Sequence, residues 1–450
     1  MRDLTEGSIL RHLLSMTLFL MGSMVFQSLY FLADMYWIGR LGRDAIAAIG
    51  LAANVMLIVL ASSQALGVGT TALVSRAIGE GDRDRTNRVF NQTLSLSIVC
   101  GAAFFAIGLI LYRPYVRWLA ADELTRSYGE QYLRWFVPSL ALQFPLISTG
   151  AALRGSGVVK PTVIILVTSV LLNLVLAPVL ILGWGTGRAL GVFGAAMATL
   201  VAIVIGTLML AAYMAFIHQY LRVQIRTWGP SLATWKEVVA IGLPSAAELG
   251  ILAIYLLIVY SLLRPFGAAA QGGFAMGARI GQSLILPAVA VAMANAPIVG
   301  QNYGARNLSR IGTAFKTAVI VGVLFMMVMM VIVRRFAATI VRAFTPDAAV
   351  VEVAVGYLAI LALTFVATGL IFAAVSVFQG LGRTVRPFVS SVIRLIAFVV
   401  PALALWRGRS SSLDALWAIS AGSIAVQAVV NLLFVAIEFR ALRLKFRMRE

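Results

Sequence analysis

The sequence predicts an all-α membrane protein whose twelve transmembrane helices form two six-helix bundles related by an internal repeat. Of its 450 residues, 61% are hydrophobic and 12% are charged, against about 45–50% apolar and about 25% charged in soluble proteins. The mean hydropathy of +0.96 covers the whole chain, and its apolar runs are near the length of about 20 residues that a membrane helix needs. This composition, with the single cysteine Cys100, excludes a soluble enzyme, a disordered protein and a disulfide-bonded secreted scaffold.

Twelve apolar runs are long enough to cross a bilayer, because a helix rises about 1.5 Å per residue and the hydrocarbon core is about 30 Å thick. Several runs exceed the minimum length, so tilt or extension into the membrane interface is expected. The predicted spans are 13–38, 45–75, 90–112, 131–152, 161–184, 190–217, 237–263, 268–299, 317–333, 352–378, 387–406 and 413–436.

The basic residues predict the orientation of these spans. Lys and Arg number 36 against 17 Asp and Glu, a net charge of +19, but nearly all lie in short gaps between apolar runs, which argues against a nucleic-acid partner. Twelve spans put both termini on one side, which carries 21 of the 36 basic residues, while the other side carries 12. The termini are therefore expected in the cytoplasm, with the basic tail 437–450 lying against anionic lipid.

The sequence aligns with itself at a shift of 225 residues, half its length. Gly79 then matches Gly304, and Arg85 matches Arg310. Each copy holds six spans, an even number, so both copies enter the membrane from the same side and should be related by an axis along the membrane normal. The predicted domains are an N-terminal six-helix bundle at 1–217, a cytoplasmic linker at 218–236, a C-terminal six-helix bundle at 237–436 and the basic tail at 437–450.

Seven short motifs occur in order along the chain, and together they resemble one known family. They are FLADMYWIGRLG at 31–42, VSRAIG at 74–79, LRGSG at 153–157, LNLVLAP at 172–178, LGVFGAAMAT at 190–199, GLP at 242–244 and VGQNYG at 299–304. The set resembles the multidrug and toxic compound extrusion (MATE) transporters over essentially the whole chain. The contexts of Arg279 and Arg394 resemble the DinF-like branch of that family.

The resemblance implies a secondary active multidrug efflux antiporter, not an enzyme. Such a protein exports organic cations or amphiphilic compounds in exchange for protons, or for sodium ions, by alternating access, and needs no cofactor beyond the coupling ion. It would be a monomeric, multi-pass protein of a bacterial inner membrane. Two alternatives stay open. One is a lipid-linked saccharide flippase of the same superfamily, which needs a cationic cavity. The other is a membrane-embedded enzyme, although no His, Asp and Glu cluster lies within the spans.

Only two of the 17 acidic residues lie well inside predicted spans, Asp34 and Glu248. A charge at mid-bilayer costs about 2.5–3.5 kcal/mol on insertion scales, so such residues usually face a bundle interior or a water-filled cavity. Gln27, Tyr30 and Asp34 recur at i, i+3 and i+7, so they share one helical face. A carboxyl group placed there is suited to accept a proton from one side and release it to the other.

The resemblance implies that Asp34 is the N-terminal proton site and that Asn173 lines it. The family often has a second aspartate four residues after that asparagine, where this chain has Ala177. Asp34 with Asn173 must then suffice, or coupling runs elsewhere. The alternative for Asp34 is an interfacial position, since Arg40 follows six residues later.

Glu248 is the acidic residue of the second half, and two basic residues, Arg279 and Arg394, lie in spans of the same half. A buried carboxylate is most readily stabilised by an opposite charge. One hypothesis is therefore a structural ion pair of Glu248 with Arg279 or Arg394. The other is that Glu248 senses a substrate or an ion.

Overall fold

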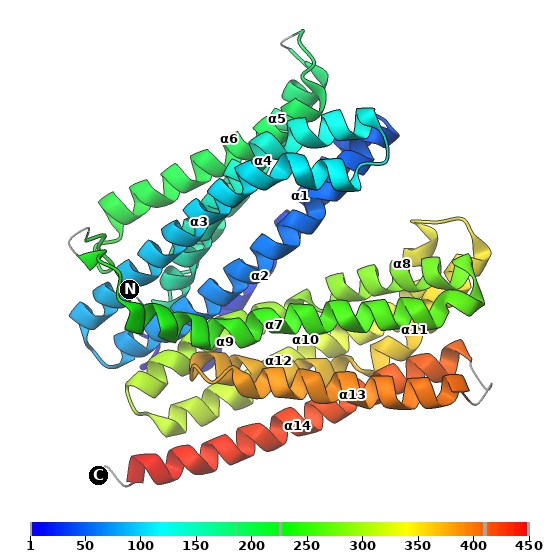
Figure 1. Cartoon of the computed structure of the whole chain (residues 1–450). Helices are drawn as coiled ribbons and strands as arrows, with labels where there is room; N and C mark the ends of the chain where they lie inside the picture. The colour runs from blue at the N-terminus through cyan, green and yellow to red at the C-terminus, as the bar shows by residue number, and fades with distance from the viewer. Residues whose placement is uncertain (1, 186, 225–226, 408–411, 448–450) are drawn as a thin grey trace. The chain divides into compact units, whose positions relative to one another are not determined.

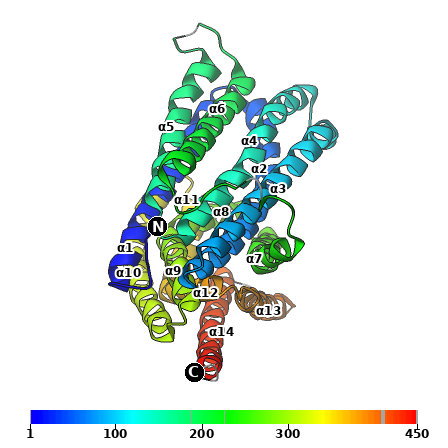
Figure 2. The same cartoon turned by 90° about the vertical axis from the view of Figure 1, so that its left-hand side faces the viewer.

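The computed structural model describes residues 2–185, 187–224, 227–407 and 412–447, with the side chains of 30–35, 407 and 447 outside the description. Within these residues the chain consists of helices joined by turns (Figures 1 and 2). The helices are α1 (Ile9–Gly39), α2 (Arg43–Gly79), α3 (Arg83–Leu119), α4 (Glu123–Gly155), α5 (Lys160–Leu182), α6 (Gly191–Ala212), the π-helical turn η1 (Tyr213–Ile217), α7 (Leu232–Leu263), the 3-10 turn η3 (Arg264–Phe266), α8 (Ala268–Leu284), α9 (Leu286–Gly304), α10 (Leu308–Arg342), α11 (Ala348–Leu363), α12 (Phe365–Gly380), α13 (Val385–Arg407) and α14 (Leu413–Arg447).

These helices confirm the predicted fold class. In the described part of the chain, 11 helical segments are long and apolar enough to cross a membrane, and a bent pair brings the number to 12. One of the segments is α8 with α9, which meet at Ile285, where Pro287 falls in the first turn of the second helix. The last helix, α14, runs on to Arg447 and so includes most of the residues that the sequence assigned to a tail.

The bent pair corrects the prediction of one continuous span at 352–378. α11 ends and α12 begins on either side of Thr364, with an angle of 56° between them. No proline or glycine lies at the break. The Thr364 hydroxyl donates to the carbonyl of Leu361 at 2.7 Å, and the Thr368 hydroxyl donates to the carbonyl of Thr364 at 3.0 Å. Hydroxyls that bond back to helix carbonyls compete with the backbone ladder and bend helices.

The chain divides into two compact units. Unit 1 comprises 1–3 and 18–243, and unit 2 comprises 4–17 and 244–450. Two helices are therefore shared by the units: α1 begins in unit 2 and continues in unit 1 after Thr17, whereas α7 begins in unit 1 and continues in unit 2 from Pro244. The division inside α7 falls within the Gly-Leu-Pro motif.

The same contacts recur in both units at the 225-residue shift. In unit 1, a Cβ on Gly155 of α4 would lie 3.2 Å from the Thr71 carbonyl oxygen of α2. In unit 2, a Cβ on Gly380 of α12 would lie 2.5 Å from the Ala296 carbonyl oxygen of α9. A side chain at Gly380 would collide with the facing backbone and one at Gly155 would press on it, so glycine favours the close approach in both units. The repeat seen in the sequence is therefore a repeat of helix packing.

The helix pairs of the two units also correspond. In unit 1, α4 packs on α2, α3 and α6, and α5 packs on α6 (Figures 1 and 2). In unit 2, α12 packs on α9, α10 and α14, and α13 packs on α14. The central helix of each unit is thus the fourth crossing of its repeat, and the fifth and sixth crossings form a pair beside it.

Candidate functional site

A polar and aromatic cluster lies in the interior of unit 2, where α7, α13 and α14 meet. The Tyr255 hydroxyl of α7 lies 2.8 Å from the Ser420 hydroxyl of α14. The Arg394 guanidinium of α13 lies 5.5 Å from the centre of the Tyr255 ring, and the Phe398 ring packs edge-on at 4.8 Å. Tyr255 is 8% exposed. This cation–π contact fixes an arginine beside a buried tyrosine within the predicted membrane core.

Hydrogen bonds extend the cluster along α13 and α14. The Gln427 side chain donates to the Ser391 hydroxyl at 3.1 Å and accepts from the Arg394 guanidinium at 3.5 Å. Four residues further along α14, Asn431 is fully buried, and neither atom of its side-chain amide has a hydrogen-bond partner in the described part of the chain. A buried amide without partners is costly.

Glu248 lies on α7, toward the same end of unit 2 as Gln427. It precedes Tyr255 by seven residues, so the two side chains share a face of α7. Gln427 follows Ser420 by seven residues on α14, which runs in the opposite direction to α7 (Figure 1). Both residues are therefore displaced by about 10 Å from the Tyr255–Ser420 contact, toward the same end of the unit.

The Glu248 carboxylate has no cation beside it in the described structure. Its Oε1 atom is buried and makes no hydrogen bond. No ion pair joins Glu248 to Arg279 or Arg394 in the described structure, because Arg394 contacts Tyr255 and Gln427 and Arg279 is exposed on α8. The hypothesis of a structural ion pair is therefore wrong, and the hypothesis that Glu248 senses a substrate or an ion stays a prediction.

The predicted site residues of unit 1 are only partly brought together. Asn173 of α5 is 3% exposed, and its amide donates to the Thr199 hydroxyl of α6 at 3.3 Å. Gln27 of α1 is exposed. The side chains of Tyr30 and Asp34 lie outside the described residues, so their roles stay predictions.

Sequence reasoning missed the polar stripe on α14. Ser420, Gln427, Asn431 and Glu438 recur at i, i+7, i+11 and i+18, which places them on one helical face. That spacing was visible in the sequence, but uncharged residues in an apolar run give a weak signal. Glu438 is fully buried and pairs with both Arg383 and Arg386, which precede and begin α13. Among the described residues, no three His, Cys, Asp or Glu side chains gather in a metal-binding group.

Two duplicated units with polar groups buried in apolar interiors define a multi-pass membrane carrier. The MatE family model matches residues 20–179 and 244–403, one match in each repeat. The chain therefore belongs to the MATE family of transporters, and the predicted family is confirmed.

Similar proteins agree with this assignment. The chain is 26% identical to the FAD transporter of Shewanella oneidensis, over 83% of both chains. It is also 26% identical to the probable multidrug resistance protein NorM of Thermotoga maritima, over 77% of this chain and 74% of that one. A crystal structure of MATE in the bent conformation superposes with a TM-score of 0.91 at 25% identity, covering 99% of this chain and 98% of that chain.

Proposed function

We propose that this protein is a secondary active antiporter that exports organic cations or amphiphilic compounds in exchange for protons, by alternating access. The family match and the multidrug resistance name of the T. maritima relative support the export of small molecules. The 21-to-12 distribution of basic residues supports a location in a bacterial inner membrane with both termini in the cytoplasm. The protein acts as a monomer, and it belongs to the DinF-like branch.

The unpartnered Glu248 carboxylate is the observation that carries the proposal. A buried carboxylate oxygen without a hydrogen bond or a cation is unfavourable while the group is ionised. This unfavourable charge is neutralised when the carboxylate binds a proton, a sodium ion or the positive charge of a substrate. Arrival of a second cation then displaces the first, and this competition is the basis of exchange transport.

Asp34 performs the matching task in unit 1, with Gln27, Tyr30 and Asn173 as its polar surroundings. Asn173 is bonded to Thr199, which fixes its amide at the α5–α6 contact. Where the family often has a second aspartate, Ala177 is buried and apolar. Asp34 is therefore the carboxyl group that unit 1 offers for coupling at this place.

Transport in proteoliposomes with separately imposed proton and sodium gradients tests this proposal. A proton gradient alone should drive efflux of a fluorescent organic cation. Asp34→Asn should abolish the driven efflux, and Glu248→Gln should lower it at least tenfold, because each removes an exchangeable charge. Asp44→Asn is the matched control, since Asp44 pairs with the exposed Arg43 at the start of α2. Full transport by both variants would exclude these carboxylates from coupling.

A second candidate substrate is a planar organic anion of the flavin nucleotide type. Arg394 lies half-buried against Tyr255 in unit 2, a cation next to an aromatic face, and the S. oneidensis relative is named an FAD transporter. An aromatic ring with a phosphate group suits both neighbours. Arg394→Gln separates the two candidates: loss of FAD export with retained cation export favours the anion, and the reverse favours the cation.

A further inference from the structure

A cavity of about 570 Å³ lies within unit 1. Its walls come from α3, α4, α6 with η1, and the segment 218–223 that follows η1. Most of the lining is apolar and includes Phe90, Pro145 and Met214. This volume falls within the range of about 300–1,000 Å³ that is typical of small-molecule sites.

The linker segment that forms one wall of the cavity is held along α3 by hydrogen bonds from side-chain amides. The Asn87 amide donates to the Tyr220 carbonyl at 3.2 Å and accepts from the Arg222 backbone N–H at 2.7 Å. The Asn91 amide donates to the Arg222 carbonyl at 2.8 Å and accepts from the Gln224 backbone N–H at 2.7 Å. Two asparagines one helical turn apart thus bind alternate residues of the linker, as a neighbouring β-strand would.

Three polar residues of the linker line this cavity, His218, Gln219 and Arg222. His218 is 5% exposed, and its Nε2 atom is buried without a hydrogen-bond partner in the described structure. Burial lowers the His218 pKa to about 4, so the ring is neutral at pH 7, and in the tautomer that carries its proton on Nε2 this atom offers a donor to a ligand. Arg222 also lines the cavity and is exposed, and its Nε donates to the Gln219 carbonyl at 3.2 Å. A hydrogen-bond donor inside and a cation at the edge select an anionic group and disfavour an organic cation.

The surface beside the cavity is apolar. Phe216 is 81% exposed and Ile217 is 68% exposed, directly before His218, and Val223 of the lining is 48% exposed. Exposed aromatic and aliphatic side chains next to an arginine are typical of the membrane interface. A ligand entering here comes from the bilayer, with an apolar tail and an anionic head.

We propose that this cavity binds an anionic phospholipid of the leaflet that faces the linker. An acyl chain lies among Phe90, Leu94, Met214 and their apolar neighbours, and the phosphate group contacts Arg222 and the His218 Nε2–H. Because one wall is the linker itself, the bound lipid adds contacts to the segment that connects the two repeats. Lipid composition thereby affects how firmly the linker is held on α3.

Photolabelling tests the site directly. The full-length protein, purified in nanodiscs, is exposed to phosphatidylglycerol that carries a diazirine in its acyl chain, and the labelled peptide is mapped. Label is expected on the cavity-lining residues between 207 and 223 with phosphatidylglycerol, and at least tenfold less with phosphatidylcholine carrying the same group. Equal labelling by the two lipids would overturn the proposal.

Two variants with matched controls localise the binding. Ala211→Trp fills the cavity from an exposed position of its lining and should abolish the label, whereas Leu208→Trp, 63% exposed on the same helix and outside the lining, should retain it. Arg222→Gln should weaken phosphatidylglycerol binding, measured by native mass spectrometry, about tenfold, which corresponds to about 1.4 kcal/mol. Arg188→Gln, an exposed arginine in the loop between α5 and α6, should not.

Competition identifies the source of the anion. Excess palmitate that removes the label would show that the occupant is a single-chain fatty acid, and excess inorganic phosphate that removes it would show a simple anion site. Either result overturns the phospholipid assignment. Unlabelled phosphatidylglycerol as the effective competitor supports it. Unchanged labelling of Ala211→Trp, with an unfolding temperature equal to that of Leu208→Trp, would exclude this cavity.

Discussion

The turn between the second and third crossings occurs in both units, and the two matching arginines, Arg85 and Arg310, bind different partners. In unit 1, Asp82 caps α3 by accepting from the Arg85 backbone N–H at 2.8 Å. In unit 2, Asn307 caps α10 by accepting from the Arg310 backbone N–H at 3.1 Å. The cap and the arginine after it are retained at the 225-residue shift, and the partners of the two guanidinium groups differ.

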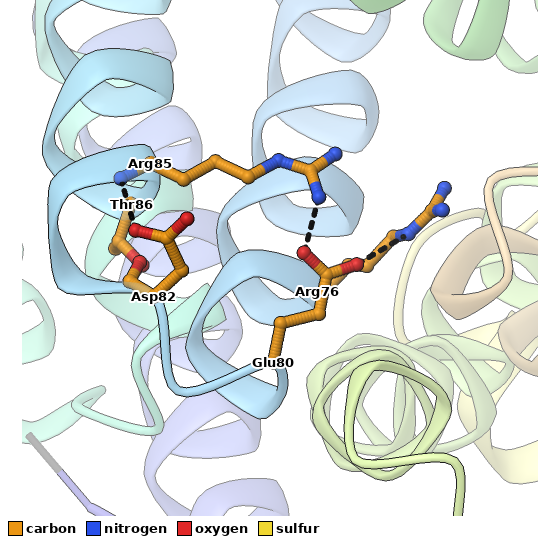
Figure 3. Close-up of polar contacts among 5 residues, drawn as sticks. All are labelled: Arg76, Glu80, Asp82, Arg85 and Thr86. Carbon is orange, nitrogen blue, oxygen red and sulfur yellow. Dashed lines mark hydrogen bonds and ion pairs between the residues drawn. The ribbon is translucent and has the colours of Figure 1, made fainter.

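In unit 1, the Arg85 side chain binds Glu80, a residue of its own turn. Glu80 binds both Arg85 and Arg76, and Asp82 accepts from the backbone of Arg85 while its own carbonyl accepts from Thr86 (Figure 3). The Arg85 and Glu80 side chains are 38% and 26% exposed. Such ion pairs contribute little to stability, about 0–1 kcal/mol.

In unit 2, the Arg310 side chain binds the N-terminal segment, which is far away in the sequence. The counterpart of Glu80 is Ala305, and Arg310 instead donates to the backbone carbonyls of Leu4, Glu6 and Gly7 at 3.1–3.3 Å. Gln301 accepts from the Leu4 backbone N–H at 2.9 Å, and Leu4 is fully buried. Unit 2 thus has an alanine where unit 1 has a glutamate, and Arg310 binds the N-terminal segment in place of a carboxylate of its own turn. Two repeats with the same fold can therefore use matching arginines for different contacts.

Arg310→Gln should produce the largest effect of the changes that test this comparison. Three carbonyls of the N-terminal segment lose their charged donor, and loss of hydrogen bonds to a charged, half-buried group should lower the free energy of unfolding of unit 2 by about 2–4 kcal/mol. The amides of residues 2–12 should exchange with deuterium at least tenfold faster. Arg306→Gln, exposed and four residues earlier, is the control. Unchanged exchange would mean that Gln301 and Asn302, whose amide donates to the Leu4 carbonyl at 3.1 Å, hold the segment unaided.

Ala305→Glu should convert the turn of unit 2 toward that of unit 1. Ala305 is exposed in a backbone conformation open to any residue, with φ −71°, so the change should not disturb the fold. The new carboxylate lies five residues before Arg310, as Glu80 lies before Arg85, and should compete for the guanidinium. Exchange of the N-terminal amides should rise severalfold. Ala305→Gln, equal in size and uncharged, should leave it close to the parent value, and a rise in both variants would rule out charge as the cause.

Arg85→Gln should have a much smaller effect than Arg310→Gln. The pair that it breaks is partly exposed, so the unfolding free energy of unit 1 should fall by about 1 kcal/mol or less. The loss should shrink further at high salt, where exposed charges are screened. Thermal unfolding of the two variants at low and high salt measures the difference. A loss equal to that of Arg310→Gln would remove the contrast between the two turns.

The sequence predicted the features that depend on length, composition and spacing. The apolar runs predicted the crossings, and the 225-residue shift predicted two copies, whose helix packing repeats at Gly155 and Gly380. It did not predict features that depend on a partner far along the chain. Glu438 falls in the predicted basic tail 437–450, but two arginines near the start of α13 bind it in the interior.

The candidate site was predictable only in part, for the same reason. A carboxyl group inside an apolar run stands out, so Glu248 was found. Whether an arginine of the same half lies beside it depends on the rotation of three helices, which composition does not fix. Tyr255, Gln427 and Asn431 were missed, because a buried hydroxyl or amide differs little from its neighbours until its partners, or their absence, are known.

Acid should act on the cap at the start of the fourth crossing of unit 1, and this effect should be the smallest. Asp122 caps α4, and Asp347 caps α11. The backbone N–H of Thr125 at 2.7 Å, followed by its hydroxyl at 3.1 Å, lowers the Asp122 pKa below the ordinary value of 3.8. A lowered folded-state pKa gives stability that is complete above the unfolded value and is lost as pH falls through the folded value. Unfolding temperatures between pH 5 and pH 2 should therefore fall less steeply in Asp122→Asn, which keeps a cap that does not titrate, than in the parent protein. Identical slopes would show that the charge of Asp122 adds nothing to its cap.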